Sequence, residues 1–240
     1  CRIYGTAFAS AAELSTYVAN LEEAKKRDHR LLGKQLELFS FHDEAPGFPF
    51  FHPRGMIIYN ELISLWRELH MAEGYIEIKT PIILREELWK RSGHYDHYRD
   101  HMYFTEIEGG KFAVKPMNCP GGLLIYKSHQ HSYREFPLKV AELGQVHRHE
   151  LSGVMHGLFR VKSFIIDDAH IFCLEEQLTA EVEKVIALIL QLYQKFQFKD
   201  VHLELSTKPD NAMGSEEMWD KATNALKCAL DASNRPYRIN

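Results

Sequence analysis

The sequence predicts an α+β fold in which an antiparallel β-sheet is flanked by helices. Three observations support this prediction. Apolar residues recur at helical spacing in several long segments, and in other segments they alternate with polar residues at the spacing of two that is typical of β-strands. The expected strands also come in neighbouring pairs joined by short glycine-containing loops, which favours antiparallel pairing over alternating strand–helix units.

The composition is that of a folded domain without a strong overall charge. Of 240 residues, 45% are hydrophobic and 12% aromatic, so the chain can bury a sizeable core. The formal net charge of −4 excludes an overall basic field, and any contact with RNA must be local. No apolar stretch reaches membrane-spanning length, and the four cysteines are widely spaced, so we expect a cytoplasmic protein that contacts no membrane.

Residues 1–45 are predicted to be a helical linker segment that leads into a core domain at residues 46–240. Ser10 and Glu13 have the spacing of a capping box, and the helix that follows is expected to end near Gly33. Proline and glycine concentrate just after this segment, which indicates an ordered connector and a subdomain boundary.

Periodicity divides the remaining residues into helices and strands. Helices are predicted at residues 56–71, 175–196 and 215–232, with Gly74 ending the first and Ser215 capping the last. Single strands are predicted at residues 75–81 and 201–205. Antiparallel pairs are predicted for residues 102–107 with 111–115 and for residues 139–150 with 159–172.

Three segments are rich in groups that bind phosphates or metals, namely residues 115–121, 147–150 and 160–170. From the residues alone, none of them decides a function. Arg148 and Glu150 are compatible with a surface ion pair, and Cys119 with a small packed apolar side chain. His170 is equally compatible with a hydrogen-bonded core histidine, and residues 167–168 with two solvated aspartates.

The same segments, in the same order, resemble the class II aminoacyl-tRNA synthetases and in particular their threonine-specific members. Residues 74–81 resemble motif 1, a helix and strand that end at proline and form the dimer interface. Arg148-His149-Glu150, the loop after it and Arg160 resemble motif 2. Segments typical of the threonine-specific members are matched by residues 115–121 and 167–172, and residues 2–7, 26–30 and 92–94 match the same family too.

The resemblance implies a ligase that activates L-threonine with ATP, forming threonyl-adenylate, and transfers the amino acid to tRNA(Thr). It also implies a homodimer with the class II catalytic fold. Motif 3 and its ATP-binding arginine have no match in the sequence, so we expect a C-terminally incomplete catalytic domain.

The resemblance also implies a role for each residue of the ATP site. Arg148 is expected to bind the α-phosphate and the threonine carboxylate, where charge develops during the reaction. Arg160 is expected to bind the γ-phosphate, Glu150 the adenine amino group, and Phe164 to stack on adenine. His94 is expected near the ribose and the tRNA 3′ end, with a role in transfer. Mg²⁺ accompanies the ATP phosphates.

For the amino acid, the resemblance implies a zinc site in which Cys119 and His170 are two of three protein ligands. The third ligand is expected outside this chain. Zinc with open coordination is expected to bind the amino and hydroxyl groups of threonine. Valine lacks the hydroxyl, loses a ligand bond and is rejected. Asp168 is expected to accept a hydrogen bond from the threonine hydroxyl, and Met117 to line the pocket.

Two positions depart from the pattern of the family. Gly122 stands where histidine is common, and Ile166 stands where glutamine commonly precedes the paired aspartates. Isoleucine cannot donate a hydrogen bond, so amino-acid affinity or identity could be altered. Two alternatives therefore stay open: a prolyl or seryl synthetase, most of which lack the cysteine–histidine pair, and a non-catalytic paralogue that acts as a binding or regulatory module.

Overall fold

The structure is a computed structural model that describes residues 2–210 and 212–240, so Cys1, one of the four cysteines, lies outside the described residues. The chain divides into two compact units. Unit 1 comprises Cys1–Glu68, Lys79–Leu123 and Glu142–Asp168, and unit 2 comprises Leu69–Ile78, Leu124–Ala141 and Ala169–Asn240. The linker boundary after residue 45 stays a prediction.

The N-terminal segment contains two helices, α1 (Ala11–Lys26) and α2 (His29–Gln35), where one helix ending near Gly33 was predicted. Ser10 caps α1 by accepting from Glu13 N at 3.2 Å, as the sequence indicates. The predicted helix is interrupted because the Asp28 carboxylate accepts from Arg30 N at 2.8 Å and so caps the start of a second helix. Of the described residues in α1, none is buried.

The proline-rich connector lies between two short strands, β1 (Phe39–Ser40) and β2 (Phe50–Phe51), which pair antiparallel. Helix α3 (Pro53–Ala72) follows directly and agrees with the predicted helix. It ends before Gly74, whose φ of +79° is the left-handed conformation that glycine adopts most readily after a helix.

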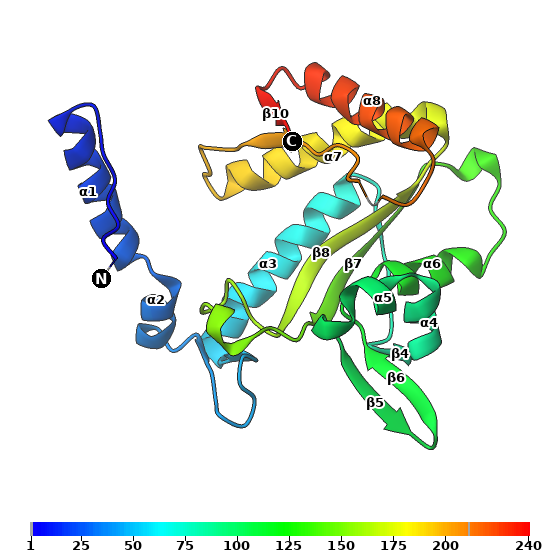
Figure 1. Cartoon of the computed structure of the whole chain (residues 1–240), viewed down its shortest axis with the longest axis horizontal. Coiled ribbons are helices and arrows are strands. Elements are labelled where there is room, and N and C mark those ends of the chain that lie inside the picture. Colours follow the sequence, from blue (N-terminus) through cyan, green and yellow to red (C-terminus); the bar gives the residue numbers. More distant parts are fainter. Residues whose placement is uncertain (1, 211) are drawn as a thin grey trace. The chain divides into compact units, whose positions relative to one another are not determined.

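A three-stranded antiparallel sheet in unit 1 consists of β4 (Ile83–Arg85), β6 (Gly110–Val114) and β5 (Tyr103–Ile107), in that order (Figure 1). The predicted β5–β6 hairpin is confirmed, and Glu108 and Gly109 in its turn both have positive φ. Trp89 of α4 (Glu86–Arg91) is fully buried against this sheet. The strand β4, helix α4 and helix α5 (His94–Tyr98) were not predicted, because such short elements carry no clear periodicity.

The central sheet has the order β3 (Ile76–Glu77), β7 (Leu138–His147), β8 (Ser163–Phe172). Arg148 N, just after β7, donates to Lys162 O, just before β8, at 2.9 Å. Because the end of one strand lies beside the start of the next, β7 and β8 are antiparallel, as predicted. The strand β3 is parallel to β7, a pairing that the sequence did not predict.

Unit 2 contains α7 (Leu178–Lys195) beside α8 (Glu216–Ala232), followed by β10 (Tyr237–Ile239) paired in parallel with β9 (Leu203–Leu205) (Figure 1). Both helices were predicted, whereas β10 was not. Glu181 of α7 is 4% exposed and lies 3.1 Å from the ammonium of Lys139, which attaches α7 to β7 inside the unit.

A buried ionic cluster lies at the centre of unit 1. Lys115, Glu142 and Thr80 are 1%, 4% and 3% exposed. The Lys115 ammonium donates to Glu142 Oε1 at 2.9 Å and to Thr80 Oγ1 at 2.7 Å. Thr80 donates to the same carboxylate from its backbone N, at 2.8 Å, and from its hydroxyl, at 2.9 Å. A buried charge is tolerated only when it is paired and hydrogen-bonded in this way.

The backbone of Lys115 connects two further segments of unit 1. Its N–H donates to Ile82 O at 2.8 Å, and its carbonyl accepts from His147 N at 3.1 Å. The Lys115 side chain and backbone together therefore determine where residues 116–119 lie.

Removing one partner of this cluster leaves the other charge buried and unpaired. We expect Lys115→Met to lower the free energy of unfolding by about 3–5 kcal/mol, and the double variant Lys115→Met with Glu142→Leu to recover part of that loss. Denaturant unfolding measures both. Lys26→Met, which removes the exposed Lys26–Glu23 pair, is the control and should change stability by less than about 1 kcal/mol. Equal losses of unfolding free energy in Lys115→Met and Lys26→Met would contradict the claim that burial makes the Lys115–Glu142 pair important.

The imidazole of His147 lies at the end of β7 against Ser163, with Nε2 3.2 Å from Ser163 Oγ. The Ser163 hydroxyl accepts from Gln145 Nε2 at 2.6 Å, which leaves its proton for His147. Burial lowers the pKa of His147 below its usual 6.5, and the nearby Lys115 charge lowers it further.

This lowered pKa predicts a loss of stability in mild acid. Well above pH 6.5, His147 is neutral in both the folded and the unfolded chain, and its protonation costs no stability. As the pH falls below that value, the unfolded chain takes up a proton first, so stability is lost until the folded pKa is passed. His147→Gln should therefore lose less thermal stability than the wild type between about pH 7 and pH 5. Exposed His202→Gln is the matched control, and parallel curves for His147→Gln and wild type would refute this account.

Candidate functional site

Arg148 is held in a fixed position immediately after β7. Its Nε donates to Pro116 O at 3.2 Å. The guanidinium carbon lies 5.2 Å from the centroid of the Phe164 ring and 5.7 Å from that of Tyr98. The structure thus brings together two predicted site residues, Arg148 and Phe164. Tyr98 was not predicted, because a single tyrosine at the end of a five-residue helix has no recognisable pattern.

Glu150 and Arg160 form an ion pair at the two ends of the loop between β7 and β8. Nε of Arg160 lies 3.0 Å, and its terminal nitrogen 2.9 Å, from Glu150 Oε2. The alternative ion pair considered for Arg148 and Glu150 is thus replaced by one with Arg160. The pair lies in unit 1 between the end of β7 and the start of β8, the part of the chain that also contains Arg148.

The loop between β7 and β8 is held by His29 of α2. Leu158 N donates to His29 Nε2 at 2.9 Å, so this nitrogen carries no proton. The His29 ring also meets Phe159 edge-on at a centroid distance of 4.5 Å. A Cβ at Gly157 would lie 2.1 Å from His29 Nε2, so only glycine fits there. His29 had matched the family only as part of a longer segment, and the structure identifies its contact.

His94 and Met117, both predicted site residues, are in direct contact. His94 Nε2 lies 3.1 Å from Met117 Sδ, and His94 Nδ1 lies 2.8 Å from Ser92 Oγ. The Ser92 hydroxyl donates to Trp89 O at 3.2 Å, so Ser92 Oγ accepts from His94 Nδ1, and in the neutral ring Nε2 carries no proton. Burial lowers the pKa of His94, which favours the neutral imidazole.

Each of the paired aspartates on β8 accepts a hydrogen bond from a buried side chain. Trp66 Nε1 donates to Asp167 Oδ1 at 2.5 Å, and Asn118 Nδ2 donates to Asp168 Oδ2 at 2.9 Å. Trp66 and Asn118 are 7% and 1% exposed. Asp168 is therefore half-buried and hydrogen-bonded rather than simply solvated, whereas Asp167 is exposed and also hydrogen-bonded. Asn118 lies inside the segment that the sequence singled out, but it had been given no role.

Cys119 begins α6 (Cys119–Lys127) as a half-buried free thiol in unit 1, whereas His170 belongs to unit 2. Burial raises the pKa of the Cys119 thiol, and the negative charge of Asp168 raises it further. Across residues 2–210 and 212–240, no group of three or more histidine, cysteine, aspartate or glutamate side chains could hold a metal ion. The zinc site stays a prediction.

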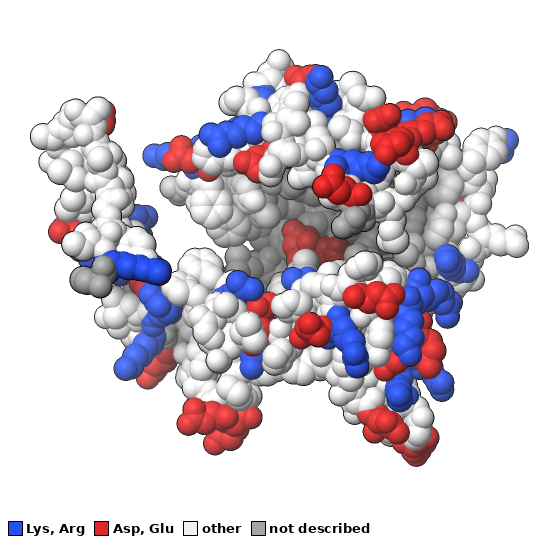
Figure 2. All heavy atoms as spheres, in the orientation of Figure 1, with Lys and Arg blue, Asp and Glu red and all other residues white. Residues whose placement is uncertain are grey.

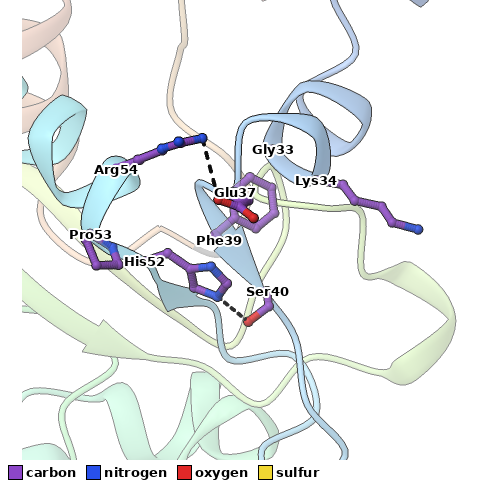
Figure 3. Close-up of a pocket in the computed structure, with 8 residues that line it drawn as sticks. All are labelled: Gly33, Lys34, Glu37, Phe39, Ser40, His52, Pro53 and Arg54. Carbon is purple, nitrogen blue, oxygen red and sulfur yellow. Dashed lines mark hydrogen bonds and ion pairs between the residues drawn. The ribbon is translucent and has the colours of Figure 1, made fainter.

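A separate cavity of about 540 Å³ opens in unit 1 between α2 and the start of α3 (Figure 3). Its lining includes Lys34, Glu37 and Arg54, with Arg54 lying 3.5 Å from the Glu37 carboxylate. Ser40 Oγ lies 2.8 Å from His52 Nε2 on the same wall. None of its lining residues was predicted to be functional.

The surface carries charges of both signs. Figure 2 shows lysine and arginine interspersed with aspartate and glutamate on the displayed face. This mixture agrees with the small net charge of −4. In the part of the chain that the structure describes, no helix is long and apolar enough to cross a membrane.

Comparison with known proteins identifies the family. Residues 103–233, more than half of the chain, match the tRNA synthetase class II core domain (G, H, P, S and T). The chain is 59% identical over 239 residues to the threonine–tRNA ligase of Carboxydothermus hydrogenoformans and 58% identical to that of Clostridium tetani. All of this chain is aligned in both cases, but it spans only 38% and 37% of the two relatives.

Solved structures agree with these relatives. The crystal structure of the RNA binding domain of threonyl-tRNA synthetase from Cryptosporidium parvum superposes with a TM-score of 0.85 at 42% identity, covering 89% of this chain and 54% of that one. A prolyl-tRNA synthetase from Giardia lamblia, at 21% identity and a TM-score of 0.66, covers 72% of this chain and 36% of its own and shares the fold. The α+β class II fold is thereby confirmed. The chain belongs to the class II aminoacyl-tRNA synthetases, and threonine–tRNA ligases are among its relatives.

Proposed function

We propose that this chain provides most of the catalytic site of a threonine–tRNA ligase, which activates L-threonine with ATP and transfers it to tRNA(Thr). The observation that carries the proposal is Arg148, held by Pro116 O and lying over the Phe164 ring. A guanidinium fixed in this way presents its remaining donors to anionic oxygens without having to reorganise. The identity with threonine–tRNA ligases supports threonine as the amino acid.

In the activation step, the threonine carboxylate attacks the α-phosphate of ATP, the bond to the β-phosphate breaks and pyrophosphate leaves, while charge accumulates on the phosphoryl oxygens. Arg148 binds the α-phosphate and the carboxylate and so stabilises that charge. Phe164 stacks on adenine, Glu150 accepts from the adenine amino group, and Arg160 binds the γ-phosphate. Mg²⁺ accompanies the phosphates of the nucleotide.

In the amino-acid pocket, Asp168 accepts from the threonine hydroxyl and Met117 lines the wall. Cys119 and His170 are the proposed zinc ligands, since a thiolate and an imidazole suit this metal and Cys119 is a free thiol. Bound zinc would supply open coordination for the amino and hydroxyl groups of threonine, and valine, which lacks the hydroxyl, would lose one ligand bond.

In the transfer step, His94 lies near the ribose and the tRNA 3′ end. Its contact with Met117 connects it to the wall of the amino-acid pocket. A neutral imidazole can accept a proton, as a group that assists transfer must.

Residues 74–81 form the homodimer interface of the whole protein, which acts in the cytoplasm.

Threonine-dependent pyrophosphate exchange by the full-length protein tests this function. Arg148→Ala should lower kcat by about 100-fold or more, because the α-phosphate gains partners only in the transition state. Arg160→Ala should mainly raise KM for ATP. Exposed Arg238→Ala is the control. Exchange with proline or serine in place of threonine would favour the related synthetases, and no exchange with any of them would favour a non-catalytic paralogue.

Metal analysis tests the zinc ligands separately. We expect about one zinc ion per catalytic site in extensively dialysed full-length protein, because a thiolate with imidazole ligands retains zinc tightly. Cys119→Ala and His170→Ala should each lose the metal and threonine activation. Cys228→Ala, which removes an exposed free cysteine, should keep both. A wild-type protein without zinc, or zinc retained in both ligand variants, would exclude this site.

A further inference from the structure

We propose that Asn118 is a positioning residue that orients the Asp168 carboxylate toward the substrate hydroxyl, and that residue 144 is glycine to make room for Asn118. The proposal rests on the proposed role of Asp168 in binding threonine. It adds two residues, Asn118 and Gly144, that determine how well this carboxylate is placed.

The first observation is the hydrogen bond itself. Asn118 Nδ2 donates to Asp168 Oδ2 at 2.9 Å, and the asparagine is 1% exposed. A bond from an amide to an ionised carboxylate is stronger than one between neutral groups, and burial shields it from competing water. With Oδ2 held by this bond, rotation of the carboxylate is restricted, which leaves Oδ1 as the acceptor for the substrate hydroxyl.

The second observation is the tight fit between Asn118 and β7. A Cβ added to Gly144 would lie 1.9 Å from Asn118 Nδ2, 2.3 Å from Cγ and 2.5 Å from Oδ1. All three distances are far below van der Waals contact, so any side chain at residue 144 displaces the whole amide. Gly144 itself is buried in the strand, which leaves the amide lying against bare backbone.

The third observation is that the backbone of Asn118 is also fixed. Its carbonyl accepts from Gly122 N at 3.0 Å in the first turn of α6, and three residues earlier Lys115 belongs to the buried ionic cluster. The amide therefore extends from a backbone that is held on both sides. This rigidity lets a single hydrogen bond determine the orientation of Asp168.

The fourth observation separates a positioning role from simple packing. Asn118 Oδ1 is buried and has no hydrogen-bond partner among the described residues. A buried acceptor without a partner costs free energy, and an apolar side chain of the same shape would avoid that cost. A polar amide at this position is therefore explained by what its nitrogen does for Asp168 rather than by stability.

The test compares three variants of the full-length protein in threonine-dependent pyrophosphate exchange. Asn118→Asp keeps the shape and removes the donor, whereas Gly144→Ala keeps the donor and displaces it. Both should raise KM for threonine about tenfold, the effect of losing one charge-assisted hydrogen bond, while KM for ATP stays within about twofold. Asn60→Asp makes the same chemical change at an exposed position of α3 and should leave both constants unchanged.

The outcomes separate this inference from the proposed function. A wild-type protein without threonine-dependent exchange refutes the proposed function and this inference with it. An active wild type with an unchanged KM for threonine in Asn118→Asp refutes the inference alone. Equal increases in both KM values, together with a lower melting temperature, would show that Asn118 is structural and would also overturn the proposal. Asn118→Asp decides the question even if Gly144→Ala fails to fold.

Discussion

The buried pair of Lys115 and Glu142, with Thr80 hydrogen-bonded to both, is the interaction on which the rest of unit 1 depends. It joins the segment before β4, the end of β6 and the middle of β7, which are far apart in the sequence. Charges this deeply buried tolerate little displacement, because each lost contact leaves an unpaired ion in a medium of low dielectric constant. The pair therefore holds the three segments at one fixed spacing.

The residues that follow Lys115 transmit this constraint to the proposed site. Pro116 O accepts from Arg148, and the Asn118 amide donates to Asp168. One rigid stretch thus contacts both the arginine proposed to bind the α-phosphate and the aspartate proposed to bind the amino acid. A catalytic site gains from such an arrangement, since groups that are positioned before the substrate binds need no reorganisation during the reaction.

The loop between β7 and β8 receives its support from outside this stretch. His29 of α2 accepts a hydrogen bond from Leu158 N, and Gly157 leaves the space that the imidazole fills. Arg160 at the end of the loop pairs with Glu150 at its start. The second helix of the N-terminal segment therefore supports the loop of the candidate site as well as connecting to it.

The sequence by itself determined the longer elements and indicated the residues of the candidate site. Periodicity and caps predicted α3, α7, α8 and the β5–β6 hairpin, because these signals act over neighbouring residues, and the motif around Arg148 and Glu150 indicated the family. Only the tertiary structure decided the parallel pairing of β3 with β7, the partner of Glu150 and the roles of Tyr98, His29 and Asn118. Each of these depends on contacts between residues that lie apart in the sequence, and no local pattern encodes such contacts.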